Sequence, residues 1–194
     1  MADAINWAAL FLAIITSTGL LLSQDWRWRI GFLAAQYLSA FWMVQTHWPA
    51  SMAASKLVTG WMACAVLGIA QLNASRRGEG ELTRPHGRLF HFFTACMVLV
   101  VTFAVSSRVT VWLGLSLPIA WGSLLLMGLG LLQLGITSDP FRVVIGLLSL
   151  FSGFEILYTS VESSSLVTAL LAVVNLGLAL AGAFFLGSVE EERI

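Results

Sequence analysis

Continuous apolar stretches recur along the whole chain, and they are the feature that most limits how it can fold. Crossing a bilayer as an α-helix takes about 20 mostly apolar residues, and stretches of that length follow one another here. Only 10% of the 194 residues are charged, whereas a soluble domain carries about 25%. A membrane β-barrel would show segments of about 10 residues that alternate in polarity. We therefore predict an all-α, polytopic membrane helical bundle whose helices satisfy their own backbone hydrogen bonds.

Breaks between the apolar stretches divide the chain into about seven transmembrane helices. The predicted spans are 4–22, 30–45, 49–72, 89–105, 112–136, 140–158 and 166–186. Polar turns are predicted at 24–29, 47–49, 106–108, 138–142 and 162–165, and a longer aqueous loop at 73–88. Pro49 and Pro140 stand where a proline fits the first helical turn, and Pro118 predicts a kink within the fifth span. The first span is kept as a transmembrane helix, because Asp3 stands where a cleavable signal would carry basic residues.

The arginines are distributed unevenly between the two sets of loops, and this predicts an orientation. Eight arginines fall in the first turn, the 73–88 loop, the 138–142 turn and the tail, whereas only Arg108 falls on the other side. Cytoplasmic loops carry the excess of basic residues. We therefore predict an amino terminus outside and a carboxyl terminus in the cytoplasm, in the cytoplasmic (inner) membrane of a bacterium or archaeon.

Two ionisable residues remain well inside predicted spans, namely Lys56 in the third and Glu155 in the sixth. A charge at the bilayer centre costs roughly 2.5–3.5 kcal/mol on insertion scales, so each residue needs an explanation. At 1.5 Å per residue, both lie about 10 Å below the outer surface. At one depth they can pass a proton if their helices touch, which the sequence does not show. In the alternative, Lys56 extends its ammonium group to the surface, and Glu155 is a protonated, hydrogen-bonded core residue.

Weaker polar candidates lie in other spans, and they are Gln36, Gln133, Tyr158 and Asn175. Amides inside a membrane more often bond a neighbouring helix than bind a ligand. We include Asn175 and Tyr158 with Lys56 and Glu155 in a candidate ion pathway.

Other classes of function find no support in the sequence. Cys64 and Cys96 stand alone within apolar stretches, so neither a disulfide nor a metal site is predicted. Ten basic and ten acidic residues cancel, which does not favour a nucleic-acid partner. No phosphate-binding loop, dinucleotide fingerprint or nucleophile motif is present. We predict no cofactor and no active site on this chain, so any redox chemistry would lie on other chains.

The segment Gly153-Phe154-Glu155-Ile156 resembles the GLEI segment of the small K-type (4L-type) subunit of complex I, whose glutamate lies in the ion path. The whole chain is similar to hydrogenase-4 component E, which has a helical extension before a K-like unit. Residues 28–32 with Gln36 resemble its first turn and second helix, and residues 55–58 resemble its intramembrane lysine segment. The resemblance implies a four-helix extension at 1–108 and a three-helix K-like unit at 109–194.

The sequence departs from these families at two positions. The K-type family has a second carboxylate near the position of Asn175, and component E has a glutamate near the position of Phe151. These departures leave fewer titratable sites here, so the chain either transmits protons less well than its relatives or only supports its neighbours.

The resemblance implies a membrane-arm subunit of a complex I-related or membrane-hydrogenase complex. Glu155 and Lys56 would then contribute to a lateral proton or sodium pathway. The implied partners are the lipid bilayer and the antiporter-like and core membrane-arm subunits, which the sixth and seventh spans are expected to contact. Two alternatives stay open, namely a purely structural or assembly subunit of such a complex and an independent small membrane transporter.

Overall fold

The computed structural model describes residues 2–46, 49–76, 88–161 and 164–188, and these residues form seven helices and no strands. The all-α prediction is therefore confirmed for the described part of the chain. The helices are α1 (Ala2–Leu22), α2 (Trp26–Gln45), α3 (Ala50–Arg76), α4 (Arg88–Leu113), α5 (Leu117–Ile136), α6 (Pro140–Val161) and α7 (Ser165–Ser188). Most of the predicted 73–88 loop, part of the 162–165 turn and the acidic tail lie outside the described residues.

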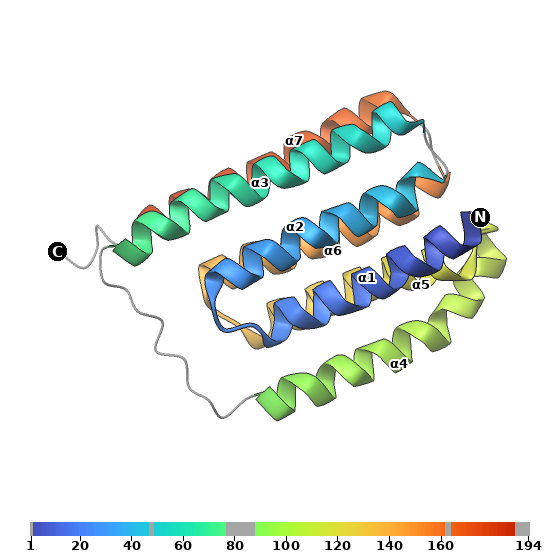
Figure 1. Cartoon of the computed structure of the whole chain (residues 1–194), viewed down its shortest axis with the longest axis horizontal. Coiled ribbons are helices and arrows are strands. Elements are labelled where there is room, and N and C mark those ends of the chain that lie inside the picture. Colours follow the sequence, from blue (N-terminus) through green and yellow to red (C-terminus); the bar gives the residue numbers. More distant parts are fainter. Residues whose placement is uncertain (1, 47–48, 77–87, 162–163, 189–194) are drawn as a thin grey trace.

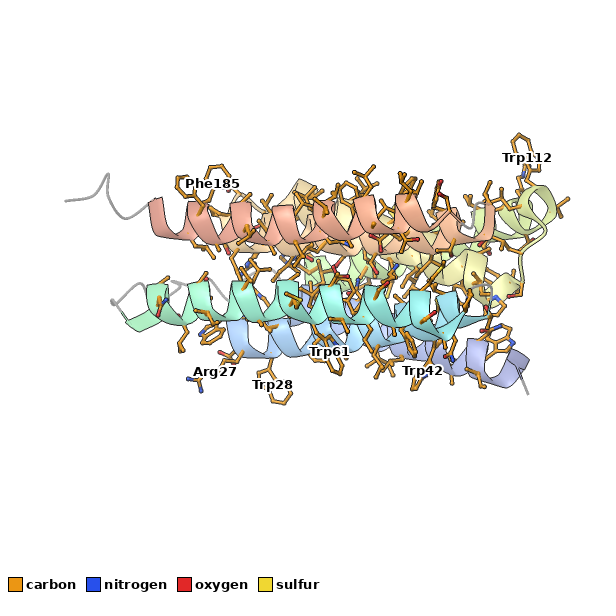
Figure 2. All side chains as sticks on the ribbon, turned by 90° about the horizontal axis from the view of Figure 1, so that it is seen from above. Arg27, Trp28, Trp42, Trp61, Trp112 and Phe185 are labelled. Carbon is orange, nitrogen blue, oxygen red and sulfur yellow. The ribbon has the colours of Figure 1, made fainter. Side chains whose placement is uncertain are left out.

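The helices form two layers (Figure 1). One layer holds α1, α2 and α3, and the other holds α5, α6 and α7, so that α1 lies on α5, α2 on α6 and α3 on α7. Figure 2 shows the two layers from above, with α3 and α7 on opposite sides of the interface. Helix α4 packs beside α5 and α1 at one edge. Helices α2 and α6 therefore occupy the middle of the bundle and run in the same direction, whereas α3 and α7 form the edge opposite α4.

Six of the seven helices are long and apolar enough to cross a membrane, which indicates a multi-pass membrane protein. The exception is α2, which carries Arg27, Arg29 and Gln36 and is less apolar than the others. At 20 residues it is still about 30 Å long, and it lies among α1, α3 and α6. Large apolar side chains, including those of Phe93 and Phe184, are exposed on the outer helices. Such a surface fits lipid and does not fit water.

The chain turns between α4 and α5 later than the sequence predicts. The predicted turn at 106–108 is wrong, because α4 continues to Leu113 and Arg108 lies within it. The Ser106 and Ser107 hydroxyls donate hydrogen bonds to carbonyls one turn earlier in the helix, so these serines do not end it. The turn occurs at Gly114, whose φ of 65° is the left-handed conformation that favours glycine.

The predicted kink at Pro118 is also wrong. Helix α5 begins at Leu117, so Pro118 lies in its first turn. A proline fits there because the first backbone N–H groups of a helix need no partner within the helix. The boundary predicted at 108/109 lies inside α4, and contacts of α1 with α5, of α2 with α6 and of α3 with α7 join the two parts. Whether the two parts are separate units stays a prediction.

Helices α5 and α6 approach closely at Gly153. A Cβ atom there would lie 2.6 Å from the Ser123 carbonyl oxygen, which is shorter than real Cβ contacts allow. Small residues let membrane helices pack backbone to backbone in this way. Glu155 stands two residues later, about 200° further round the helix. The contact that fixes α6 against α5 therefore directs Glu155 away from α5, toward α3 and α7.

Candidate functional site

Three helices bring one polar side chain each to the same point of the bundle. Lys56 comes from α3, Glu155 from α6 and Asn175 from α7. Lys56 stands six residues after the start of α3, and Glu155 stands six residues before the end of α6. Both positions lie about 9 Å from the same end of the bundle. This end, which also holds the 114–116 turn, is called the lysine end below.

Both carboxylate oxygens of Glu155 have partners. The Lys56 Nζ atom lies 2.8 Å from Oε2, and Asn175 Nδ2 donates a hydrogen bond of 2.6 Å to Oε1. Lys56 Nζ also donates to the Ser152 carbonyl oxygen at 3.2 Å. The three residues are 7%, 4% and 1% exposed. The sequence predicted a common depth for the lysine and the glutamate, and the tertiary structure adds that they form a buried ion pair.

The geometry excludes a lysine that extends to the surface. The Lys56 ammonium group points into the bundle, toward Glu155 and a backbone carbonyl. Helices α3 and α6 lie diagonally across the two layers, and the long lysine side chain spans the distance between them. Removing one partner of such a pair typically costs 3–5 kcal/mol, because the other charge is then buried alone.

A small cavity lies beside the ion pair. Its volume for water-sized molecules is about 20 Å³, and its lining includes Ser55, Thr59, Glu155, Thr168 and Asn175. The lining comes from α3, α6 and α7. Because Ser55 is exposed and Thr59 and Thr168 are half-buried, the cavity reaches the side of the bundle between α3 and α7.

The two tyrosines of the chain have different environments. Tyr158, the one chosen from the sequence, is half-buried, and its ring lies 6.1 Å from that of Phe154. Among the described residues its hydroxyl makes no hydrogen bond to Glu155, Lys56 or Asn175. The structure therefore does not bring Tyr158 into the cluster.

Tyr37 on α2 is the residue that the sequence analysis missed. It is 1% exposed, and its ring covers Gly60, which lies one turn after Lys56 on α3. The only signal in the sequence is a polar aromatic residue in the middle of a span, directly after Gln36.

The intramembrane amides bond neighbouring helices, as predicted. Gln133 Nε2 on α5 donates to the Arg142 carbonyl on α6 at 3.0 Å. The Ser149 hydroxyl on α6 donates to Gln36 Oε1 on α2 at 3.5 Å. Together with the Asn175 bond, each amide links α6 to a different helix, so these side chains hold α6 in the centre of the bundle.

A second polar cluster lies at the opposite end, where α2 and α6 begin. We call this the arginine end. A cavity of about 10 Å³ there is lined in part by Arg29, His91, Gln133 and Arg142. Arg29 is 2% exposed, and its Nε donates a hydrogen bond of 2.8 Å to the Ser23 carbonyl oxygen. The two ends of the bundle therefore hold two separate buried polar sites.

Comparison with known proteins adds no further constraint: no family model, curated protein or solved structure matches the chain.

Proposed function

We propose that this chain is a membrane-arm subunit of a complex I-related or membrane-hydrogenase-type redox complex. In this proposal Glu155 is a protonation site on a lateral ion pathway, and Lys56 and Asn175 hold it in place. Two observations support this proposal. Residues 153–156 resemble the K-type segment, and Lys56, Glu155 and Asn175 form a buried cluster.

The observation that carries the proposal is the buried Lys56–Glu155 pair. Ionisable residues inside a membrane are rare, and they commonly mark ion or proton relays. Here a carboxylate and an ammonium group meet at 2.8 Å on separate helices. A proton can bind to this carboxylate and neutralise it. The ion pair is then lost, and Lys56 is released to reorient.

The pair favours protons over sodium ions. A lysine ammonium has only donor hydrogens and no lone pair with which to ligate a cation. It also occupies one oxygen of Glu155, while Asn175 occupies the other. A proton can bind to this carboxylate without a larger coordination shell, whereas a sodium ion would need several oxygen ligands.

The cavity supports transfer sideways in the membrane. It lies on the α3–α7 edge and reaches the side of the bundle at Ser55. A neighbouring subunit packed against this edge would place its own polar groups next to Glu155. The proposed partners are therefore antiporter-like or core membrane-arm subunits in a bacterial or archaeal cytoplasmic membrane.

The decisive experiment replaces Glu155 by glutamine in the assembled complex. Glu155→Gln keeps the size and one acceptor oxygen of the side chain but cannot bind and release a proton. We expect proton pumping into vesicles to fall strongly when it is normalised to subunit content, while electron transfer to soluble acceptors, normalised in the same way, stays near wild type. Lys56→Met should give a similar pumping defect, because it removes the partner of the carboxylate.

Asp139→Asn provides the matched control, since it makes the same carboxylate-to-amide change at the arginine end. It should pump at the wild-type rate. Full pumping by Glu155→Gln would leave only the structural or assembly alternative. A chain that purifies alone, with no other membrane subunit, would favour the independent transporter.

The proposed orientation has its own test. The arginine distribution predicts that the 73–88 loop lies in the cytoplasm, so a cysteine at Glu79 should resist membrane-impermeant thiol reagents in intact cells. The same residue should react in inverted vesicles, in a background that lacks Cys64 and Cys96. Labelling of position 79 from outside would reverse the proposed orientation.

A further inference from the structure

Four buried polar atoms around and beyond Glu155 have no hydrogen-bond partner among the described residues. They are Asn175 Oδ1, Ser152 Oγ, Tyr37 Oη and Gln36 Nε2. Each of these four residues is 1% exposed. Leaving one such group unsatisfied typically costs about 1–3 kcal/mol, so each of the four atoms needs a partner.

Three of these atoms belong to α2 and α6, which pack against each other, and Asn175 lies on α7, where it bonds Glu155. Ser149, Ser152 and Glu155 stand three residues apart on α6, about 4.5 Å per step along the helix axis. Two contacts of α2 lie beside this row. The Tyr37 ring packs against Gly60 of α3, one turn after Lys56, and Gln36 Oε1 accepts the Ser149 hydroxyl. The row therefore extends about 9 Å from Glu155 toward the arginine end.

Buried water is the usual partner of such groups. It typically makes about three hydrogen bonds to polar atoms that the protein leaves unpaired, and it needs about 10–15 Å³ of space. The cavity beside Glu155 and Asn175 offers about 20 Å³. One end of the row therefore has both the room and the polar atoms that a water molecule requires.

We propose that bound water molecules join these groups into a chain that leads from Glu155 along the α2–α6 interface to Gln36 and Ser149. Tyr37 and Ser152 are the intermediate partners. The Tyr37 hydroxyl and the Ser152 hydroxyl can each donate and accept a hydrogen bond, which is the property that a relay of protons requires.

The proposed row of water molecules ends at an apolar layer formed by Leu33 and Ile145. Leu33 stands three residues before Gln36 on α2, and Ile145 stands four residues before Ser149 on α6. Both side chains are 0% exposed and belong to one apolar cluster. Arg29 and Arg142 lie beyond this layer and line the cavity at the arginine end. The water chain is therefore closed toward that end and connected to the lateral cavity at Glu155.

The bound water stands on geometry alone, whereas its use as a proton path rests on the proposed function. If the water row carries protons, a proton on Glu155 can move toward the arginine end as far as Gln36 and Ser149. Movement past Leu33 and Ile145 would require this layer to open.

Radiolytic hydroxyl-radical footprinting of the purified full chain tests the proposal. Radicals formed from bound water oxidise the side chains that touch that water. Tyr37 and Met43 lie on the same helix and are both almost fully buried. Met43 packs in an apolar cluster against Gly122 and provides the internal control. We expect Tyr37 to be oxidised several-fold faster than Met43, although methionine is intrinsically the more reactive side chain.

Two matched variants locate the water. Gln36→Leu removes a water partner and should lower Tyr37 oxidation several-fold, whereas Gln133→Leu changes a glutamine outside the row and should leave it unchanged. If Gln36→Leu does not fold, the wild-type comparison of Tyr37 with Met43 still decides. Oxidation of Tyr37 no faster than that of Met43 would overturn the proposal. Since this readout does not involve pumping, it is independent of the result for Glu155→Gln.

Discussion

The Lys56–Glu155 site and the arginine end both bury cationic side chains, but they satisfy them differently. At the arginine end, Arg29 donates to a backbone carbonyl at Ser23, directly after α1 ends. Arg142 lies 3.6 Å from Asp139 in the first turn of its own helix. Lys56, well inside the bundle, instead meets a carboxylate from another helix.

The two sites differ because backbone carbonyls lack a partner within the helix at helix ends but not in the middle of helices. The last four carbonyls of a helix have no partner within it, so a cation near a helix end can bond to them. In the middle of a helix each carbonyl already accepts a bond from the following turn, so the bond from Lys56 to the Ser152 carbonyl is a second, shared one. A cation there needs an opposite charge brought by a distant part of the chain. Charges at helix ends are therefore local features, whereas the buried pair depends on the whole bundle.

The largest effect on stability is expected when the buried pair is broken. Lys56→Met leaves Glu155 buried without its counter-charge, and the loss should be about 3–5 kcal/mol in the free energy of unfolding. Adding Glu155→Gln should recover much of this loss, because the double variant has no unpaired charge and keeps a side chain that can bond Asn175. Denaturation of the purified protein in mixed micelles measures both variants.

A double-mutant cycle over these variants isolates the coupling between the two residues. If the double variant were as unstable as the sum of the two single variants, the ion pair would contribute nothing of its own. The contrast between the two regions would then disappear.

A smaller loss is expected for Arg29→Met at the arginine end. This change removes a charged hydrogen bond to the Ser23 carbonyl, and such bonds contribute about 1.5–3 kcal/mol. The same denaturation assay should therefore rank Arg29→Met below Lys56→Met. The reverse order would show that Arg29 contributes more to the free energy of unfolding than the Lys56–Glu155 pair does.

The smallest effect is expected for Arg142→Gln. The Arg142 and Asp139 side chains are 25% and 38% exposed, and their charges lie 3.6 Å apart within one helical turn. Partly exposed pairs of this kind contribute about 0–1 kcal/mol, so the loss of the ion pair with Asp139 should lower the free energy of unfolding by less than about 1 kcal/mol. A loss as large as that of Arg29→Met would mean that Arg142 holds the end of the bundle through other contacts.

The sequence by itself determined the helical class, the approximate spans and the depth of Lys56 and Glu155. These features depend on local properties, namely the length of apolar stretches and the number of residues to a break. Where local signals competed, the prediction was wrong. The polar residues at 106–108 suggested a turn, but the serines bond within α4 and the chain turns at Gly114 instead.

Only the tertiary structure decided which polar residues meet. It joined Lys56 to Glu155 and Asn175, packed Tyr37 against Gly60 of α3 and placed Tyr158 elsewhere. The physical reason is that membrane helices are apolar on nearly all sides, so hydropathy does not show which side faces a neighbour. That orientation depends on close contacts such as the approach of α5 to Gly153, which lie between segments far apart in the sequence.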